Sequence, residues 1–130
     1  MGKCNDSVVS YKTLVLGASV RNERYSFQAV IRLIEAGIEV IPMGINEGYI
    51  SGIKIVPPFT VQKDIHTISL YLAPEKQNQY IDFILDIKPE RVIFNPGTEN
   101  VILTRKLKLA GIFWENACSL VLLSTNQYQA

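Results

Sequence analysis

Apolar residues occur along the chain in short runs, and segments with helical spacing follow several of these runs. Short apolar runs that end at glycine or proline are typical of strands buried on both faces. The runs that predict strands of one sheet are Thr13–Leu16, 39–43, 67–72, Arg91–Phe94 and 112–115. We expect the first of them to be the central strand.

Three segments that follow these runs have the spacing of amphipathic helices. In the first, Ser26 is a candidate N-cap and Gly37 is placed to end the helix. In the second, residues 80–87 carry apolar side chains on one helical face, and a proline two positions later prevents continuation. In the third, Thr98 is the candidate cap of a helix over residues 99–110.

The remaining segments have less regular patterns. Residues 44–52 are typical of a loop, and residues 53–56, closed by two prolines, indicate a peripheral strand. Residues 118–123 fit either a short helix or another strand, because a continuous apolar run cannot be assigned by periodicity alone.

The alternation of strands and helices predicts a single doubly wound, Rossmann-like α/β domain. Its mainly parallel sheet of about five strands should carry helices on both faces. At 130 residues the chain has the length of one domain. We expect a flexible N-terminal tail over residues 1–11, the domain over residues 12–124 and a C-terminal tail over residues 125–130.

The composition argues against several partner classes. Lys and Arg number 13 against 12 Asp and Glu, so the positive surplus of a nucleic-acid-binding surface is missing. The longest apolar runs are far shorter than the ~20 residues of a membrane span, and the polar start lacks a signal-peptide core. We therefore expect a cytoplasmic protein that binds neither nucleic acid nor membrane, with Cys4 and Cys118 as free thiols.

Ligands of doubly wound sheets bind beyond the carboxyl ends of the strands, where this chain carries small, mostly uncharged residues. Gly17 and Ala18 would let the backbone approach a ligand closely. Free amides at the following helix start, together with the Ser19 hydroxyl, would suit phosphate oxygens, and Arg21 and Arg24 could add positive charge. The same turn is equally compatible with a purely structural link between strand and helix.

The fingerprint of dinucleotide-binding domains is absent. Gly17 is followed by Ser19 rather than by a second glycine, and no acidic residue ends the second strand. This argues against an ordinary NAD-dependent dehydrogenase, while another nucleotide with a pyrophosphate group stays compatible with the helix start. Pro42 and Met43, at the end of the second strand, are candidate packing surfaces for an adenine or, alternatively, core residues.

Several segments share one further pattern: KTLVLGAS at 12–19, RYS at 24–26, GIEVIP at 37–42, SLYLAPE at 69–75 and FNPGTEN at 94–100. Together with residues 110–118 they resemble the small stand-alone CoA-binding domain family over about residues 12–123. The sequence departs from many relatives at residues 20–23, where they carry a proline, and at residues 43–46, where they carry an Asn-Pro pair.

The resemblance implies a domain similar to the CoA-binding domain at the amino end of the succinyl-CoA synthetase α subunit. Its cofactor would be coenzyme A or an acyl-CoA, with no metal. The cofactor-binding candidates are Gly17, Ala18, Ser19, Arg24 and Ser26 for the phosphates, Pro42 and Met43 for the adenosine, Tyr71, Ala73 and Pro74 for the pantetheine, and Asn95, Pro96 and Gly97 at a further strand end.

Candidate catalytic groups are sparse. His66, the single histidine, precedes a strand and so belongs to the end of the sheet opposite the ligand rim, where we interpret it as a surface residue. Cys118 follows the last strand and is either a nucleophile or a small packing residue. Glu99 and Glu115 could hydrogen-bond a ligand, but they define no reaction. One histidine and two distant cysteines do not form a metal site.

Three hypotheses therefore remain open. The first is non-catalytic binding of CoA or a CoA-like adenine nucleotide at the strand ends. The second is a small nucleotide-dependent enzyme, an oxidoreductase or an acyl-group enzyme, that uses Cys118. The third is a ligand-free scaffold of the same fold, with residues 120–123 or Tyr128 contacting another chain. The oligomeric state, including a homo-oligomer, stays open.

Overall fold

The main sheet has five parallel strands in a computed structural model that describes residues 10–129. The strands are β1 (Thr13–Leu16), β2 (Val40–Met43), β5 (Thr67–Leu70), β6 (Arg91–Phe94) and β7 (Phe113–Asn116). Their order is β2-β1-β5-β6-β7, so β5 is central and the expectation that β1 occupies the centre is wrong. The chain leaves β1 for the β2 edge and then crosses to β5, which places β1 one position away from the middle.

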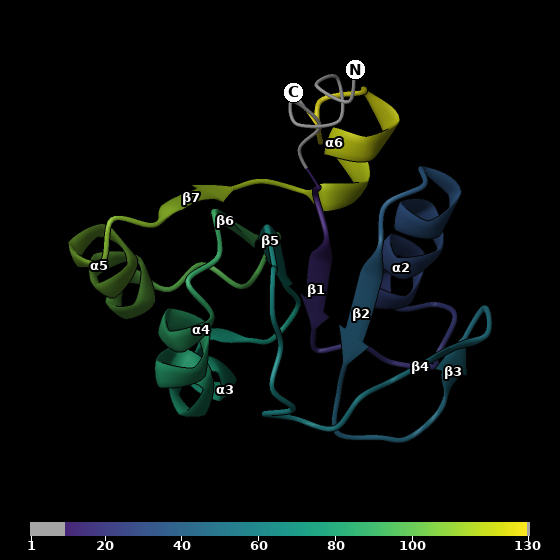
Figure 1. The fold of residues 1–130 in the computed structure, drawn as a ribbon, viewed down its shortest axis with the longest axis horizontal. Helices are drawn as coiled ribbons and strands as arrows, with labels where there is room; N and C mark the ends of the chain where they lie inside the picture. Colours follow the sequence, from purple (N-terminus) through teal and green to yellow (C-terminus); the bar gives the residue numbers. More distant parts are fainter. Residues whose placement is uncertain (1–9, 130) are drawn as a thin grey trace, which may run out of the picture.

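Helices cover both faces of the sheet, as the sequence predicts (Figure 1). On one face α2 (Tyr25–Glu35) and α6 (Ser119–Ser124) pack beside each other over a core that includes Val15 and Ile93. On the other face lie α4 (Ile81–Ile87) and α5 (Val101–Leu109), preceded by the short α3 (Pro74–Gln77) and a 3₁₀ turn over Asn78–Tyr80. The single doubly wound α/β domain is confirmed.

A small hairpin lies outside the main sheet. Its strands, β3 (Tyr49–Ile50) and β4 (Ile53–Lys54), pair antiparallel. The segment 44–52, predicted as a loop, therefore contains a strand, and the peripheral strand predicted at 53–56 is shorter than expected. Beyond β4, Val56 forms a parallel bridge with Met43. The hairpin thus stays attached to the β2 edge.

Two helix starts differ from the sequence prediction. Helix α2 has Arg24 at its N-cap position, and Ser26 is a buried first-turn residue rather than the cap. Helix α5 begins at Val101 because the Asn100 side chain caps it, accepting a hydrogen bond from the Leu103 amide at 3.2 Å. The predicted cap, Thr98, instead donates its hydroxyl to a carbonyl in the preceding turn.

The end of the chain packs into the fold. Residues 118–123 form most of α6 and are not a strand, which settles the alternative left open by periodicity. Tyr128 is buried, and its hydroxyl lies 2.7 Å from the Thr13 Oγ1 in β1. Tyr128 therefore contacts this chain, not another one as the scaffold hypothesis supposed. Cys4 and most of the predicted N-terminal tail lie outside the described residues, and the predicted domain boundaries stay a prediction.

Candidate functional site

A cleft of about 670 Å³ opens at the carboxyl ends of β1, β2 and β5. This is where the strand order reverses, because the chain runs outward from β1 to β2 and then to β5 on the other side. Such a switch point is the usual ligand position in open α/β sheets. The lining residues are Gly17, Ala18, Ser19, Arg21, Arg24, Gly44, Ile45, Asn46, Tyr71, Leu72, Ala73, Lys76, Gln79 and Tyr80.

Two glycines allow the loops of the cleft to pack together. Gly17 has a φ of +100°, and a Cβ there would lie 3.1 Å from the Tyr71 carbonyl carbon. At Gly44 a Cβ would collide with the carbonyl oxygen of Ala18. Gly17 is therefore required both for its positive φ and for the lack of a side chain, whereas Gly44 is required only because a side chain would not fit. The cleft floor is therefore formed by backbone in close contact, which only glycine permits at these two positions.

The first loop does not present its amides as the sequence suggested. The amides of Gly17 and Ala18 both donate to the Met43 carbonyl, at 2.9 and 2.8 Å. A polar loop separates this turn from α2, which starts at Tyr25. The first turn of α2 has no side-chain cap, so its amides are the donors that remain for an anion.

The charged side chains that line the cleft are positive. Arg21, Arg24 and Lys76 line it, and none of the described lining residues is a carboxylate. Arg21 is already paired, with its Nε 2.8 Å and its Nη2 2.6 Å from the Glu23 carboxylate just outside. The pKa of Glu23 lies below its usual value, chiefly through a backbone hydrogen bond and also through Arg21. The cleft therefore offers an exposed, positively charged wall, suited to phosphate groups.

Tyr71 forms a less polar part of the same cleft. Burial raises the pKa of Tyr71 to about 12, so its hydroxyl keeps its proton at neutral pH. The buried hydroxyl has no hydrogen-bond partner in the described part of the chain, while the neighbouring Ser69 and Ser119 hydroxyls bond each other at 2.8 Å. Tyr71 thus presents a mainly apolar ring to the cleft.

The buried side chain of Asn95 connects the ends of two strands with the start of a helix. Its amide nitrogen donates to the Ser69 hydroxyl at 2.9 Å and to the Leu70 carbonyl at 2.8 Å. Its side-chain oxygen accepts the Ser119 amide at 2.8 Å. These bonds use the donors and the acceptor of a buried amide, and they tie the ends of β5 and β6 to the start of α6.

The structure brings together only part of the predicted site. Gly17, Ala18, Ser19, Arg24, Tyr71 and Ala73 line the cleft. Ser26, Pro42, Met43 and Asn95 are buried behind it, and Pro74, Pro96 and Gly97 do not line it. At the end of β2 the lining residues are Ile45 and Asn46 instead, of which Ile45 is 81% exposed.

Several lining residues have no sequence motif of their own. Lys76, Gln79 and Tyr80 reach the cleft from α3 and the 3₁₀ turn. The sequence feature that could have identified them is their position shortly after Ala73, which follows a predicted strand. The helical spacing of Tyr80 instead pointed to a core face, which it also serves because it is buried.

The candidate catalytic residues do not line the cleft. His66 precedes β5 at the amino end of the sheet, opposite the cleft, as predicted. Cys118 is a partly exposed free thiol at the N-cap position of α6 and does not line the cleft. Among residues 10–129, no group of three or more histidine, cysteine or acidic side chains is arranged to hold a metal ion. Within the same residues, no helix has the length and apolar character needed to cross a bilayer.

Comparisons with known proteins match the chain to one family model and to several solved structures. A family model described as a CoA binding domain matches residues 11–124. A crystal structure of an uncharacterized protein is 40% identical, with a TM-score of 0.88, and the match covers 92% of this chain and 99% of that one. None of the curated proteins matches the chain.

More distant structures share the fold. A protein from Thermus thermophilus is 19% identical, with a TM-score of 0.81 and coverage of 91% of this chain and 90% of that one. A dinucleotide forming acetyl-coenzyme A synthetase 1 from Ca. Korarchaeum cryptofilum, solved with phosphate and ADP, is 18% identical with a TM-score of 0.67. That match covers 88% of this chain but 27% of the synthetase, so the likeness concerns one domain of a larger protein.

Proposed function

The chain belongs to the CoA binding domain family, and we propose that it binds coenzyme A or a CoA-like adenine nucleotide in the cleft at the switch point. One observation carries the proposal beyond the family: the described residues that line a cleft at the carboxyl ends of the strands include three cationic side chains and no carboxylate. Coenzyme A carries a diphosphate and a further phosphate, which such a wall would bind through charge-assisted hydrogen bonds.

The phosphates would lie between Arg24 and the uncapped first turn of α2. There the helix dipole and the backbone amides favour negative charge. Arg21 would join them after exchanging its Glu23 partner for a phosphate oxygen. The exposed Ile45 side chain at the end of β2 offers an apolar surface for the adenine.

The pantetheine arm would extend toward Tyr71 and Ala73. The Tyr71 ring supplies apolar contact, and its phenol, with a pKa of about 12, does not act as a base at neutral pH. This environment supports binding rather than catalysis, and Cys118, although near enough to Tyr71 to help raise its pKa, does not line the cleft. The second hypothesis, a nucleotide-dependent enzyme using Cys118, is therefore the weaker one.

Isothermal titration calorimetry with CoA tests the proposal. We expect Arg24→Ala to weaken CoA binding roughly 10- to 100-fold, because it removes a charge-assisted phosphate contact. Arg32→Ala is the matched control, since Arg32 is an exposed arginine on the same helix that does not line the cleft, and it should leave affinity unchanged. Equal effects of the two variants, or no CoA heat with the unmodified chain, would contradict the proposal.

A second variant addresses the ion pair beside the cleft. Glu23→Gln releases Arg21 from its carboxylate partner, so CoA should bind a few-fold more tightly, with a smaller gain at high salt. Titration with NAD, ATP and acyl-CoAs under the same conditions then ranks the nucleotide classes.

A further inference from the structure

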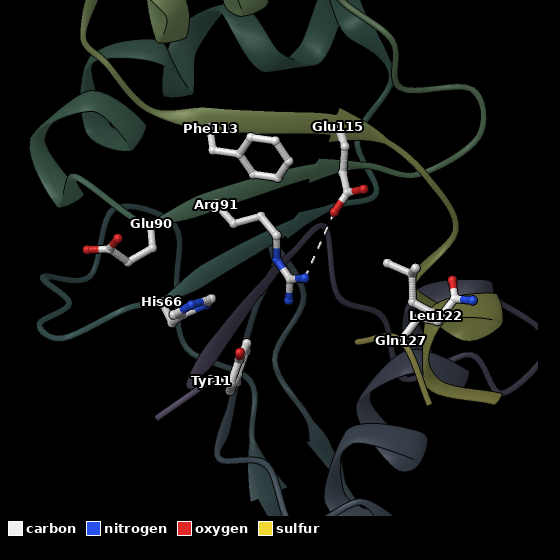
Figure 2. A pocket seen from close by; sticks show the side chains of 8 residues that line it. All are labelled: Tyr11, His66, Glu90, Arg91, Phe113, Glu115, Leu122 and Gln127. Atoms are coloured by element: carbon white, nitrogen blue, oxygen red, sulfur yellow. Dashed lines mark ion pairs between the residues drawn. The ribbon is translucent and has the colours of Figure 1, made fainter. Parts of the chain in front are cut away.

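A second pocket lies at the opposite end of the sheet, near the amino ends of β5, β6 and β7, and encloses about 520 Å³. Figure 2 shows Arg91 at its centre, with the guanidinium group pointing into the space between Tyr11, His66 and Glu115. The CoA cleft shares no lining residue with it. The chemistry of this pocket is therefore independent of the proposed function.

Arg91 is a buried cation whose hydrogen bonds are incomplete. Its side chain is 9% exposed, Nε donates to the Thr67 hydroxyl at 3.0 Å, and Nη1 donates to the Tyr128 carbonyl at 3.0 Å. The guanidinium also packs over the Tyr128 ring, with Cζ 4.5 Å from its centre. Among residues 10–129 the buried Nη2 has no hydrogen-bond partner. A buried donor of this kind needs an acceptor oxygen, and a cation prefers a carboxylate.

Glu115 does not fill that role. Its Oε2 is 3.9 Å from Nη1, which is close enough for attraction but too long for a hydrogen bond, and a third of its side chain is exposed. The dashed line in Figure 2 marks this loose pair at one side of the guanidinium. Glu115 is thus attached to Arg91 weakly and keeps most of its acceptor capacity.

The remaining charges define what kind of ligand fits. His66 has a pKa below its usual value, because of burial first and of Arg91 second, so its ring is neutral at pH 7. The described residues that line the pocket include two carboxylates: Glu115, which faces Arg91, and Glu90, whose carboxylate points away from it in Figure 2. A simple anion would satisfy Nη2 but lie beside the negative charge of Glu115. A ligand with both a carboxylate and an ammonium group matches both signs.

The walls between these charges are apolar. Phe113, which is 59% exposed, Tyr11 and Leu122 line the space beside Arg91. Such a surface would take a hydrocarbon or aromatic side chain and bury it on binding. The pocket volume is in the range that holds small organic ligands.

We propose that this pocket binds a free amino acid with an apolar side chain. The carboxylate of the amino acid accepts from Arg91 Nη2, its ammonium donates to Glu115, and its side chain lies against Phe113, Tyr11 and Leu122. The charges, the buried unpaired donor and the apolar walls each correspond to one part of this ligand.

Isothermal titration calorimetry of the full chain with leucine and phenylalanine tests the proposal. At least one should bind at up to about 10 mM. Leucinamide, which lacks the carboxylate, and N-acetyl-leucine, which lacks the ammonium, should bind about tenfold more weakly or worse. The variant Glu115→Gln should weaken leucine about tenfold and strengthen N-acetyl-leucine, because it removes the partner of the ammonium and the repulsion of the anion.

CoA binding by Glu115→Gln serves as the control, since Glu115 does not line the cleft and the variant should keep wild-type CoA affinity if it is folded. Retention of the folded far-ultraviolet circular dichroism spectrum makes the same check should CoA not bind the wild type. The proposal is overturned if neither amino acid binds, if leucinamide or N-acetyl-leucine binds as well as leucine, or if Glu115→Gln leaves their order unchanged.

Discussion

The two ends of the sheet are built in different ways. At the carboxyl ends, the cleft is formed by loops whose backbones touch at Gly17 and Gly44, and its charged side chains are exposed. At the amino ends, a buried Arg91 sits in a network of side chains and of the packed C-terminal segment. We expect the loss of a charge at the first end to have little effect on folding, and the loss of the buried charge at the second end to destabilise the chain. Substitutions at the two ends should therefore separate binding from stability.

The largest expected effect is at Arg91. Arg91→Ala removes the partners of Thr67 and the Tyr128 carbonyl and leaves a hole under the pocket, so we expect a loss of about 3–5 kcal/mol of unfolding free energy. Urea denaturation measures it. Arg24→Ala at the other end should stay within about 0.5 kcal/mol of the wild type. Similar losses for both arginines would abolish the contrast between the two ends.

A smaller effect is expected at Gly44. Gly44→Ala forces a Cβ onto the Ala18 carbonyl, so it should destabilise the chain by about 1–3 kcal/mol and also lower CoA affinity, since the loops of the cleft must separate. Gly111→Ala is the control, because its φ of +74° makes it strained but nothing lies within 4 Å. It should cost about 1 kcal/mol and leave CoA affinity unchanged. Denaturation and calorimetry on both variants check this, and a Gly44→Ala chain with wild-type affinity would show that the loop contact is not needed for binding.

The smallest effect at neutral pH is expected at Tyr71. Its hydroxyl is buried without a partner, so Tyr71→Phe should raise stability by about 1 kcal/mol at pH 7.

Above pH 10 the difference should grow. The folded chain holds the Tyr71 proton up to a pKa of about 12, while the unfolded chain releases it near 10, so this contribution is complete below pH 10 and is lost as the pH rises to 12. The phenylalanine variant lacks that loss, which amounts to roughly 3 kcal/mol. Urea denaturation at a series of pH values measures it, and parallel curves for the two chains would mean that Tyr71 titrates normally.

One helix boundary was predicted correctly from the local sequence and another was not. Gly37 ends α2 as predicted, with a φ of +77° and its amide on the Ile34 carbonyl, because a glycine in this conformation needs no distant partner. Thr98 and Asn100 are both good capping residues, and their order in the sequence favoured the wrong one. In the structure the Asn95 carbonyl accepts a hydrogen bond from the Thr98 hydroxyl, so Asn100 rather than Thr98 caps α5.

The residues of the cleft also include some that the sequence predicted and some that it did not. The glycine-led turn and the strand ends were visible in the sequence, and Gly17, Ala18, Ser19, Arg24, Tyr71 and Ala73 do line one cleft. Lys76 and Ile45 were not predicted, because a residue of a short helix and a residue of a loop have no fixed direction until the elements pack. Met43 was a plausible surface from its position in the strand, but in the structure it is completely buried.

The sequence by itself determined the strands, most of the helices and the alternation that requires a parallel sheet, because these depend on periodicity and on turn residues within a few positions. Tertiary structure decided the order of the strands, the partners of Gly17 and Gly44, and the burial of Arg91 beneath Tyr128, which is 37 residues away along the chain. Contacts of this kind depend on which segments meet in space. Hydrophobic patterning predicts which face of an element is buried, but it does not determine which side chain of another element packs against that face.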